Sequence, residues 1–313
     1  MQLDLLGWDR SFADDFAPWA AAGHRPARVA AAFPGGFLVL GEAGALRARL
    51  TGHLRHLAGP CIAGVPAVGD WVCLRAGGRP GRRGPGNPMA LIQAVLPRRT
   101  AVTRRQQGAA GERVLAANVD LVLVVAAPGR DLDPWRVERL LAVAWRSGAR
   151  PVVVLAKADR CPDWGTETAG ELRLLAAVAP GVPAYAVSCW TGDGLDQVAA
   201  LLRPGGTVVL LGAPGVGKST LVNRLAGRDL LATGELRDDG GGRHGAGGRQ
   251  LLALAGGSLV IDTPGLRELG TGPLRPGTAA FDDLDPPAAA ERRRRVRSTG
   301  RVPRAHTAER GRD

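Results

Sequence analysis

The sequence predicts a multi-domain fold in which a small N-terminal β-barrel of the oligonucleotide-binding (OB-fold) type precedes an α/β domain with a parallel sheet. Three observations predict it. The chain has 313 residues, about twice the usual size of one domain. Residues 27–97 contain five short strand-like runs separated by Gly and Pro. From residue 115 onward, continuous apolar runs alternate with helical segments, a pattern typical of a parallel sheet covered on both faces.

The N-terminal part begins with a polar and aromatic lead-in, residues 1–26. The barrel strands are expected at residues 28–33, 36–40, 45–50, 68–76 and 91–97. Residues 77–88 are rich in Gly, Pro and Arg and are predicted to form an exposed basic loop, either a plain surface loop or a contact for RNA. Residues 98–114 are interpreted as a basic linker.

The α/β domain is expected to span residues 115–275. Its first strand, residues 119–127, is followed by Asp133 and Pro134, a favourable N-cap and first-turn pair that opens a helix to about Ser147. Further strands are predicted at residues 151–156, 184–188 and 207–212, and further helices at residues 166–179, 194–202 and 218–226. The alternation stops at residues 228–248 and resumes with strands at residues 250–254 and 258–262.

Composition excludes several classes of protein. No apolar run approaches the roughly 18 to 20 residues of a membrane span, and the N-terminus has no basic segment leading into an apolar one. The chain is therefore predicted to be cytoplasmic, with no membrane partner. The four cysteines lie far apart without a C-x-x-C pair, so free thiols are expected instead of a disulfide framework or a cysteine-clustered zinc site.

The formal net charge of +12 fits an anionic partner such as RNA. Half of it comes from residues 291–313, where nine arginines face three acidic residues. Among 41 basic residues only Lys157 and Lys218 are lysines. Because a compact ammonium fits a tight phosphate cradle and a broad guanidinium does not, these two positions are predicted to require lysine specifically.

Residues 212–219 match the phosphate-binding loop (P-loop) and lie in the required context, after an apolar strand and before a helix. The glycines allow backbone N–H groups to surround a β-phosphate, and the helix N-terminus adds partial positive charge. Lys218 is predicted to reach the β- and γ-phosphate oxygens and Ser219 to ligate Mg²⁺. The predicted phosphate-binding residues are Gly212, Ala213, Pro214, Gly215, Val216, Gly217, Lys218, Ser219 and Thr220.

The second phosphate-side motif is D-T-P-G, residues 262–265. Asp262 closes an apolar strand, where a carboxylate can hold Mg²⁺ through a water molecule. The N–H of Gly265 is predicted to approach the γ-phosphate.

A guanine base is predicted to be read by residues earlier in the chain. Ala156, Lys157, Ala158 and Asp159 end a strand, and the Asp159 carboxylate can accept from the guanine N1–H and exocyclic amine, a donor pair that adenine lacks. The aliphatic stem of Lys157 would lie along the base. Ser188 and Cys189 end the next strand, in the loop whose backbone N–H would meet the guanine carbonyl.

The base-reading segments thus precede the P-loop, whereas in most GTP-binding proteins they follow it. Because ligands lie at the carboxyl ends of parallel strands, joining the termini and cutting elsewhere leaves such a site unchanged, so the order indicates a circularly permuted GTPase domain. The segment after D-T-P-G, which would respond to the γ-phosphate, then leads directly into the C-terminal tail.

With a barrel followed by these motifs in this order, residues 28–269 resemble the ribosome small-subunit-dependent GTPase A family of the RsgA/YjeQ type. Residues 68–72, 96–100 and 116–120 also resemble its barrel end, linker and first GTPase strand. The resemblance implies a monomeric Mg²⁺-dependent GTP hydrolase that binds the small (30S) ribosomal subunit and its rRNA late in maturation and hydrolyses GTP under ribosome stimulation.

The sequence departs from the family in three places. Ala156 replaces the usual Asn or Thr, which removes a side-chain tie between loops. His244 matches the family's proposed catalytic histidine, the alternative being a mobile loop histidine, but Gly245 and Ala246 replace the threonines that would complete Mg²⁺ coordination. The family's C-terminal zinc domain is absent or degenerate, because residues 285–313 contain no cysteine and only His306.

The Arg-rich tail, residues 276–313, is predicted to be disordered, with non-specific contacts to RNA phosphates. A reading-frame error or a truncation would also produce such a tail. Together with the missing switch threonine, the tail supports an alternative function: an rRNA- or ribosome-binding assembly factor that binds GTP but has weak or lost hydrolysis.

Overall fold

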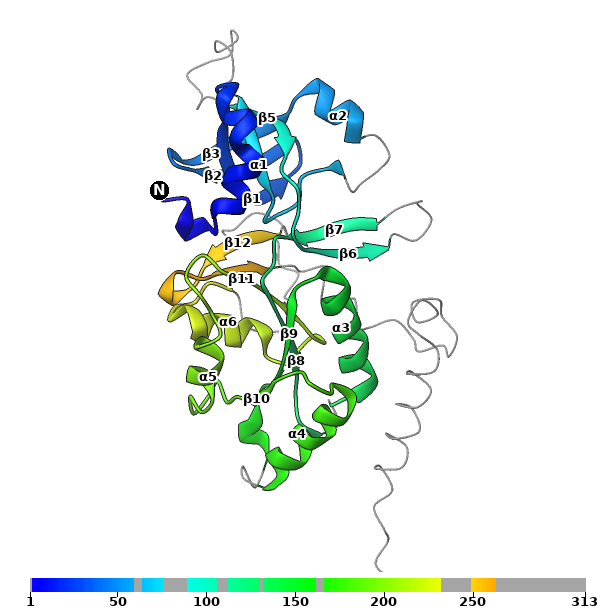
Figure 1. Ribbon diagram of the computed structural model, residues 1–313. Coiled ribbons are helices and arrows are strands. Elements are labelled where there is room, and N and C mark those ends of the chain that lie inside the picture. The colour runs from blue at the N-terminus through cyan, green and yellow to red at the C-terminus, as the bar shows by residue number, and fades with distance from the viewer. Residues whose placement is uncertain are drawn as a thin grey trace, which may run out of the picture.

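The computed structural model describes residues 2–58, 64–75, 89–105, 112–129, 132–161, 166–231 and 249–262. Within these residues an N-terminal barrel lies beside a helix-covered sheet (Figure 1). No helix of the described residues is both long and apolar enough to cross a membrane.

The N-terminal barrel has the five strands that the sequence predicts. They are β1 (Arg25–Phe33), β2 (Gly36–Gly41), β3 (Gly44–Leu50), β4 (Trp71–Arg75) and β5 (Ala90–Val95). They pair in the order β1-β2-β3-β5-β4, and β4 pairs back with β1, which closes the barrel. The β3–β5 pair is parallel and the others are antiparallel, and helix α2 (Gly52–Ala58) follows β3. Val29, Val39 and Ile92 fill the interior.

The lead-in forms structure that no sequence pattern predicted. A short 3-10 helix η1 (Asp4–Leu6) precedes α1 (Arg10–Ala21), which begins where the Asp9 carboxylate accepts from the N–H groups of Ser11 and Phe12. Phe12 and Phe16 are buried against Trp71 of the barrel. The lead-in therefore belongs to the folded body, because its aromatic residues cover one side of the barrel.

The residues interpreted as a basic linker form a hairpin. Strands β6 (Ala101–Arg105) and β7 (Glu112–Ala117) pair antiparallel in a two-stranded sheet of their own. Val102 and Leu115 are buried in the same core as the following sheet. No strand was predicted here, since the arginines mask the short apolar pattern.

The second sheet has the order β10-β9-β8-β11-β13-β12. Its strands are β8 (Leu121–Ala126), β9 (Arg150–Leu155), β10 (Ala184–Ala186), β11 (Thr207–Leu211), β12 (Gln250–Ala253) and β13 (Leu259–Asp262). The five strands from β10 to β13 are parallel, as predicted. Strand β12 is antiparallel to β13 and also pairs with β1 through Gln250 and Ala31, so the sheet continues into the barrel.

Helices cover both faces of the parallel strands, which explains their unbroken apolar runs. They are α3 (Pro134–Ser147), α4 (Thr166–Val178), α5 (Leu195–Ala199) and α6 (Lys218–Ala226), with short 3-10 helices η4 (Ala158–Arg160) and η5 (Ala255–Gly257). Residues Val122 and Val124 of β8 pack in the core that contains α3 and α4, whereas Leu121 and Leu123 pack in the core that contains α5 and α6. As predicted, Asp133 caps α3, accepting from the N–H groups of residues 135 and 136.

A buried arginine joins the barrel to the parallel sheet. Arg28 of β1 is 1% exposed, and its guanidinium donates to the carbonyls of Leu6, Gly69 and Asn118 and to the Thr207 hydroxyl. Burial lowers the Arg28 pKa to about 10.

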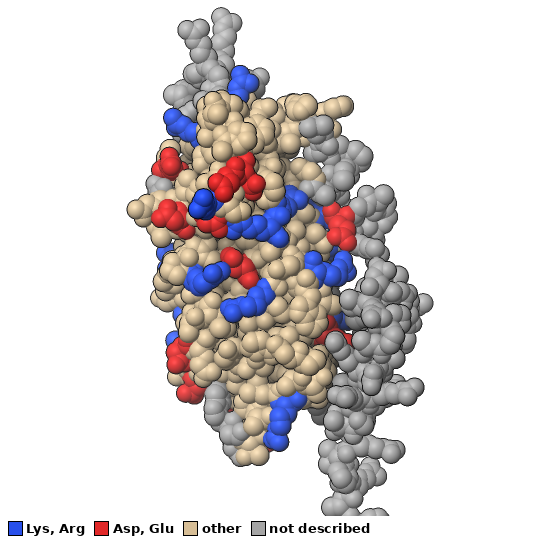
Figure 2. All heavy atoms as spheres, in the orientation of Figure 1, with Lys and Arg blue, Asp and Glu red and all other residues tan. Residues whose placement is uncertain are grey.

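Basic and acidic side chains are interspersed over the middle of the face shown in Figure 2.

Candidate nucleotide-binding site

The candidate P-loop connects β11 to α6 at the carboxyl edge of the parallel strands. Gly212, Gly215 and Gly217 have φ values of 158°, 77° and 106°. A Cβ at Gly212 would lie 2.4 Å from the Val125 carbonyl oxygen of the neighbouring strand. Glycine is therefore needed where the loop leaves the sheet, because any side chain would collide with the backbone of β8.

Lys218 is the first residue of α6 and turns back over the loop. Its Nζ donates to the carbonyl oxygens of Gly212, at 2.8 Å, and Ala213, at 2.6 Å. Ser219 and Thr220 follow in the first turn of the same helix, whose N-terminal N–H groups face the loop side. The arrangement concentrates positive charge and backbone donors at one point, the requirement for holding an anion.

The predicted base-reading segment lies directly beside the P-loop. Lys157 adopts a left-handed backbone, with φ of 57°, and its Nζ donates to the Gly215 carbonyl oxygen at 2.5 Å. A Cβ at Gly217 would lie 3.8 Å from Lys157 Cε and 3.7 Å from Ala156 Cβ. The stem of Lys157 and the small Ala156 therefore lie close to the P-loop, and the Lys157 ammonium joins the two loops through its bond to Gly215.

Asp159 and Ser188 meet across neighbouring strand ends. The Ser188 hydroxyl donates to Asp159 Oδ1 at 2.7 Å and accepts from the N–H groups of Trp190, at 3.2 Å, and Thr191, at 3.1 Å. Asp159 is exposed, whereas Ser188 is buried. Burial raises the pKa of the Cys189 thiol, which keeps this side chain neutral. One carboxylate oxygen is thus oriented by a fixed hydroxyl, which leaves the other side of Asp159 facing solvent.

Asp262 ends β13, the strand adjacent to β11. The parallel register pairs Val209 with Ile261, so Asp262 lies one residue further along, beside the end of the strand that carries the P-loop. Asp262 is half-buried and lies opposite Gln250 of β12. A carboxylate therefore stands on the strand next to the P-loop, as expected of a residue that holds Mg²⁺ through water.

The remaining predicted site residues, Gly265 and His244, lie outside the described residues, as does the Arg-rich tail.

The structure adds one residue that the motifs did not indicate. Arg224, on α6, donates through Nε to the Cys189 carbonyl oxygen at 2.6 Å and through Nη2 to the Trp190 carbonyl oxygen at 3.2 Å. No sequence signal identifies this contact, because Arg224 lies 35 residues after Cys189 and 34 residues after Trp190 in the chain.

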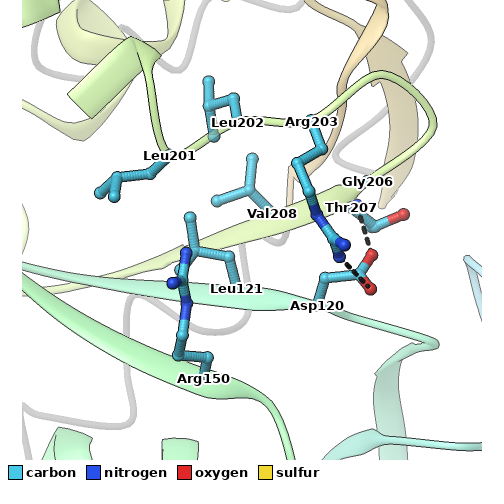
Figure 3. Close-up of a pocket in the computed structure, with 9 residues that line it drawn as sticks. All are labelled: Asp120, Leu121, Arg150, Leu201, Leu202, Arg203, Gly206, Thr207 and Val208. Atoms are coloured by element: carbon cyan, nitrogen blue, oxygen red, sulfur yellow. Dashed lines mark hydrogen bonds and ion pairs between the residues drawn. The ribbon is translucent and has the colours of Figure 1, made fainter. Parts of the chain in front are cut away.

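A pocket of about 350 Å³ lies at the opposite edge of the sheet, at the amino ends of β8, β9 and β11. Figure 3 shows Arg203 reaching Asp120 across its mouth, at 3.5 Å, with Arg150 on the neighbouring strand. The Asp120 carboxylate also accepts from the Thr207 N–H at 2.8 Å. None of the predicted nucleotide-binding residues lines this pocket, so it is separate from the candidate site.

The chain is similar to known proteins along most of its length. A family model described as RsgA GTPase matches residues 95–272. A protein of Opitutus terrae named small ribosomal subunit biogenesis GTPase RsgA is 49% identical over 275 residues, which cover 86% of this chain and 73% of the relative. A protein of the same name from Streptomyces coelicolor is 45% identical, over 86% of this chain and 70% of the relative.

Two solved structures support the fold. The crystal structure of YjeQ from Thermotoga maritima matches with a TM-score of 0.57 and 24% identity, over 79% of this chain and 76% of that one. YloQ, described as a circularly permuted GTPase, matches with a TM-score of 0.54 and 20% identity, over 79% of this chain and 73% of that one. With a matching family model over more than half of its length and relatives above 40% identity, the chain belongs to the RsgA GTPase family.

Proposed function

We propose that this chain is a GTP hydrolase that acts in the late maturation of the small ribosomal subunit; its relatives are named small ribosomal subunit biogenesis GTPases. One observation carries the proposal. Lys157 and Asp159, which precede the P-loop by more than fifty residues in the chain, belong to a segment that contacts the P-loop in space, where Lys157 Nζ bonds the Gly215 carbonyl. A base-reading segment packed against a phosphate-holding loop is the arrangement that a guanine nucleotide requires.

On the phosphate side of the site, three residues have proposed roles. Lys218 would exchange its two intraloop carbonyl partners for β- and γ-phosphate oxygens, because a charged phosphate is a stronger acceptor than a backbone carbonyl. Ser219 and Asp262 have the oxygen donors that Mg²⁺ prefers, Ser219 binding directly and Asp262 through water. When bound, Mg²⁺ would neutralise negative charge that develops on the phosphate oxygens during transfer to water.

On the base side of the site, Asp159 and Cys189 are proposed to recognise guanine. The Asp159 carboxylate would accept from the guanine N1–H and 2-amino group, oriented by the Ser188 hydroxyl. The backbone N–H of Cys189 would donate to the guanine O6. Lys157 would cover the face of the base with its methylene stem while its ammonium holds the P-loop.

For the hydrolytic step we assign the positioning of the attacking water to His244, by resemblance to the family, since D-T-P-G contains no glutamine for that purpose. The chain would act as a monomer in the cytoplasm, on rRNA-containing particles, in keeping with its net charge of +12. The segment that follows D-T-P-G would report the presence of the γ-phosphate to the tail.

The test is GTP turnover by the purified full chain, with and without purified small ribosomal subunits, using Lys218→Ala as the blank. Stimulation of the wild type above the blank is expected. GTP binding and subunit binding without stimulated turnover would instead support an assembly factor whose hydrolysis is weak or lost, the outcome that Gly245 and Ala246 would produce.

A further inference from the structure

The loop at residues 188–194 is a compact turn built largely by its own backbone. The Ser188 carbonyl accepts from the Gly192 N–H at 2.9 Å, and the Ser188 N–H donates to the Asp193 carbonyl at 3.0 Å. Because a trans peptide places its N–H opposite its carbonyl, the Cys189 N–H points away from the interior of this turn. Within the described part of the chain the Cys189 N–H has no hydrogen-bond partner, so it is available to a ligand.

The side chain of Trp190 does little to hold the next part of the turn. Trp190 is 85% exposed, so its indole contributes no apolar anchor. The Ser188 hydroxyl holds the N–H groups of Trp190 and Thr191, and Arg224 holds the carbonyls: its Nε and Nη2 donate to the carbonyl oxygens of Cys189 and Trp190 at 2.6 and 3.2 Å. These are two successive peptide units, and the planar guanidinium, with several donors in one plane, suits such a pair of acceptors better than an ammonium does.

Arg224 also belongs to the helix that begins at the P-loop. It lies six residues after Lys218 on α6, a rise of about 9 Å along the helix axis. One rigid helix therefore carries the phosphate-binding Lys218 at one end and, near the other, Arg224, which holds the loop at residues 188–194. The same helix thus relates the position of Lys218 to that of the Cys189 N–H.

We propose that Arg224 is a positioning residue for guanine recognition: it fixes the backbone on the C-terminal side of Cys189, so that the Cys189 N–H is aimed at the guanine O6. The inference rests on the proposed function and assigns the specificity for O6 to a residue outside the nucleotide-binding motifs. Without Arg224, the turn keeps its internal hydrogen bonds, including those from the Trp190 and Thr191 N–H groups to the Ser188 hydroxyl, but the carbonyls of Cys189 and Trp190 lose the donor that orients them.

The experiment compares affinities of the full chain for three nucleotides. 6-thio-GTP keeps the N1–H and the 2-amino group but replaces O6 with sulfur, a weak acceptor, and ITP keeps O6 but lacks the 2-amino group. The wild type should prefer GTP over both. Arg224→Met should weaken GTP binding roughly threefold to tenfold, the range for one lost hydrogen bond, and reduce the preference over 6-thio-GTP by a similar factor. Its preference over ITP, which depends on Asp159, should remain.

Arg228→Met is the matched control, since Arg228 is exposed just beyond α6, with no side-chain hydrogen bond among the described residues. Arg224→Lys should recover part of the lost preference, because it keeps a cationic donor near the Cys189 carbonyl. An equal loss of affinity for all three nucleotides, or no loss at all, would overturn the role of Arg224. ATP is measured alongside these three nucleotides, and a wild type without preference for GTP over ATP would overturn the proposed function itself, and this inference with it.

Discussion

Replacing Asp159 with Asn should change the nucleotide base that this chain prefers. In the structure Asp159 Oδ1 accepts from the Ser188 hydroxyl at 2.7 Å. An asparagine can keep that bond through its own carbonyl oxygen, which turns its NH₂ group toward the base. The variant then presents a donor to the guanine N1–H and 2-amino group, where the wild type presents an acceptor. Xanthine has a carbonyl in place of the 2-amino group and becomes the better partner.

The expected loss of GTP affinity follows from the two hydrogen bonds to guanine that the variant loses. A hydrogen bond to a charged acceptor contributes about 1.5–3 kcal/mol. Because Asp159 is exposed, we take the lower end for both bonds, about 3 kcal/mol in total. That corresponds to roughly a hundredfold weaker GTP binding. XTP should gain affinity, and ATP, which makes neither bond, should change little.

The assay is equilibrium binding of GTP, XTP and ATP to the full chain, with thermal unfolding to verify that the variant is folded. Asp196→Asn is the control, since it removes an exposed carboxylate from the first turn of α5 without altering a predicted nucleotide contact. Equal discrimination between GTP and ATP in the wild type and in Asp159→Asn would refute the assignment of guanine recognition to this carboxylate.

The remaining predictions concern the P-loop and the stability of the fold. Lys218→Ala should abolish tight GTP binding while the circular dichroism spectrum stays native, and unchanged affinity would argue against the P-loop assignment. Arg28→Met should cost about 3 kcal/mol in chemical denaturation, because its buried acceptors lose their donor; a loss below 1 kcal/mol would contradict that reading. Asp133→Ala should lower the free energy of unfolding by about 1 kcal/mol through loss of the α3 cap, which Asp133→Ser should restore. The hydrogen bond from Arg99 lowers the pKa of Asp9, so this pair stabilises the fold at neutral pH, and its contribution is lost as the pH falls below 4. Asp9→Asn should therefore reduce stability by less than 1 kcal/mol at pH 7, and the difference from the wild type should vanish in acid.

The sequence by itself determined the parts of this protein that depend on local pattern. The parallel strands are buried on both faces, so each is an unbroken apolar run, and each run matches a strand of the structure within about two residues. The start of α3 was predictable because Asp133 acts on N–H groups two and three residues away. The proximity of Lys157 to the P-loop followed from topology, since parallel strands bring their carboxyl ends to one edge.

Tertiary structure alone decided the features that depend on distant partners. The lead-in becomes part of the barrel body because Phe12 and Phe16 meet Trp71, and the hairpin β6–β7 is stabilised by burial of Val102 against the neighbouring sheet. The pairing of β12 with β1 and the clamp of Arg224 on residues 189 and 190 join segments far apart in the chain. Periodicity reports only which face of an element is apolar. It carries no information on which distant backbone carbonyl an arginine will reach, because that distance is set by the packing of the whole fold.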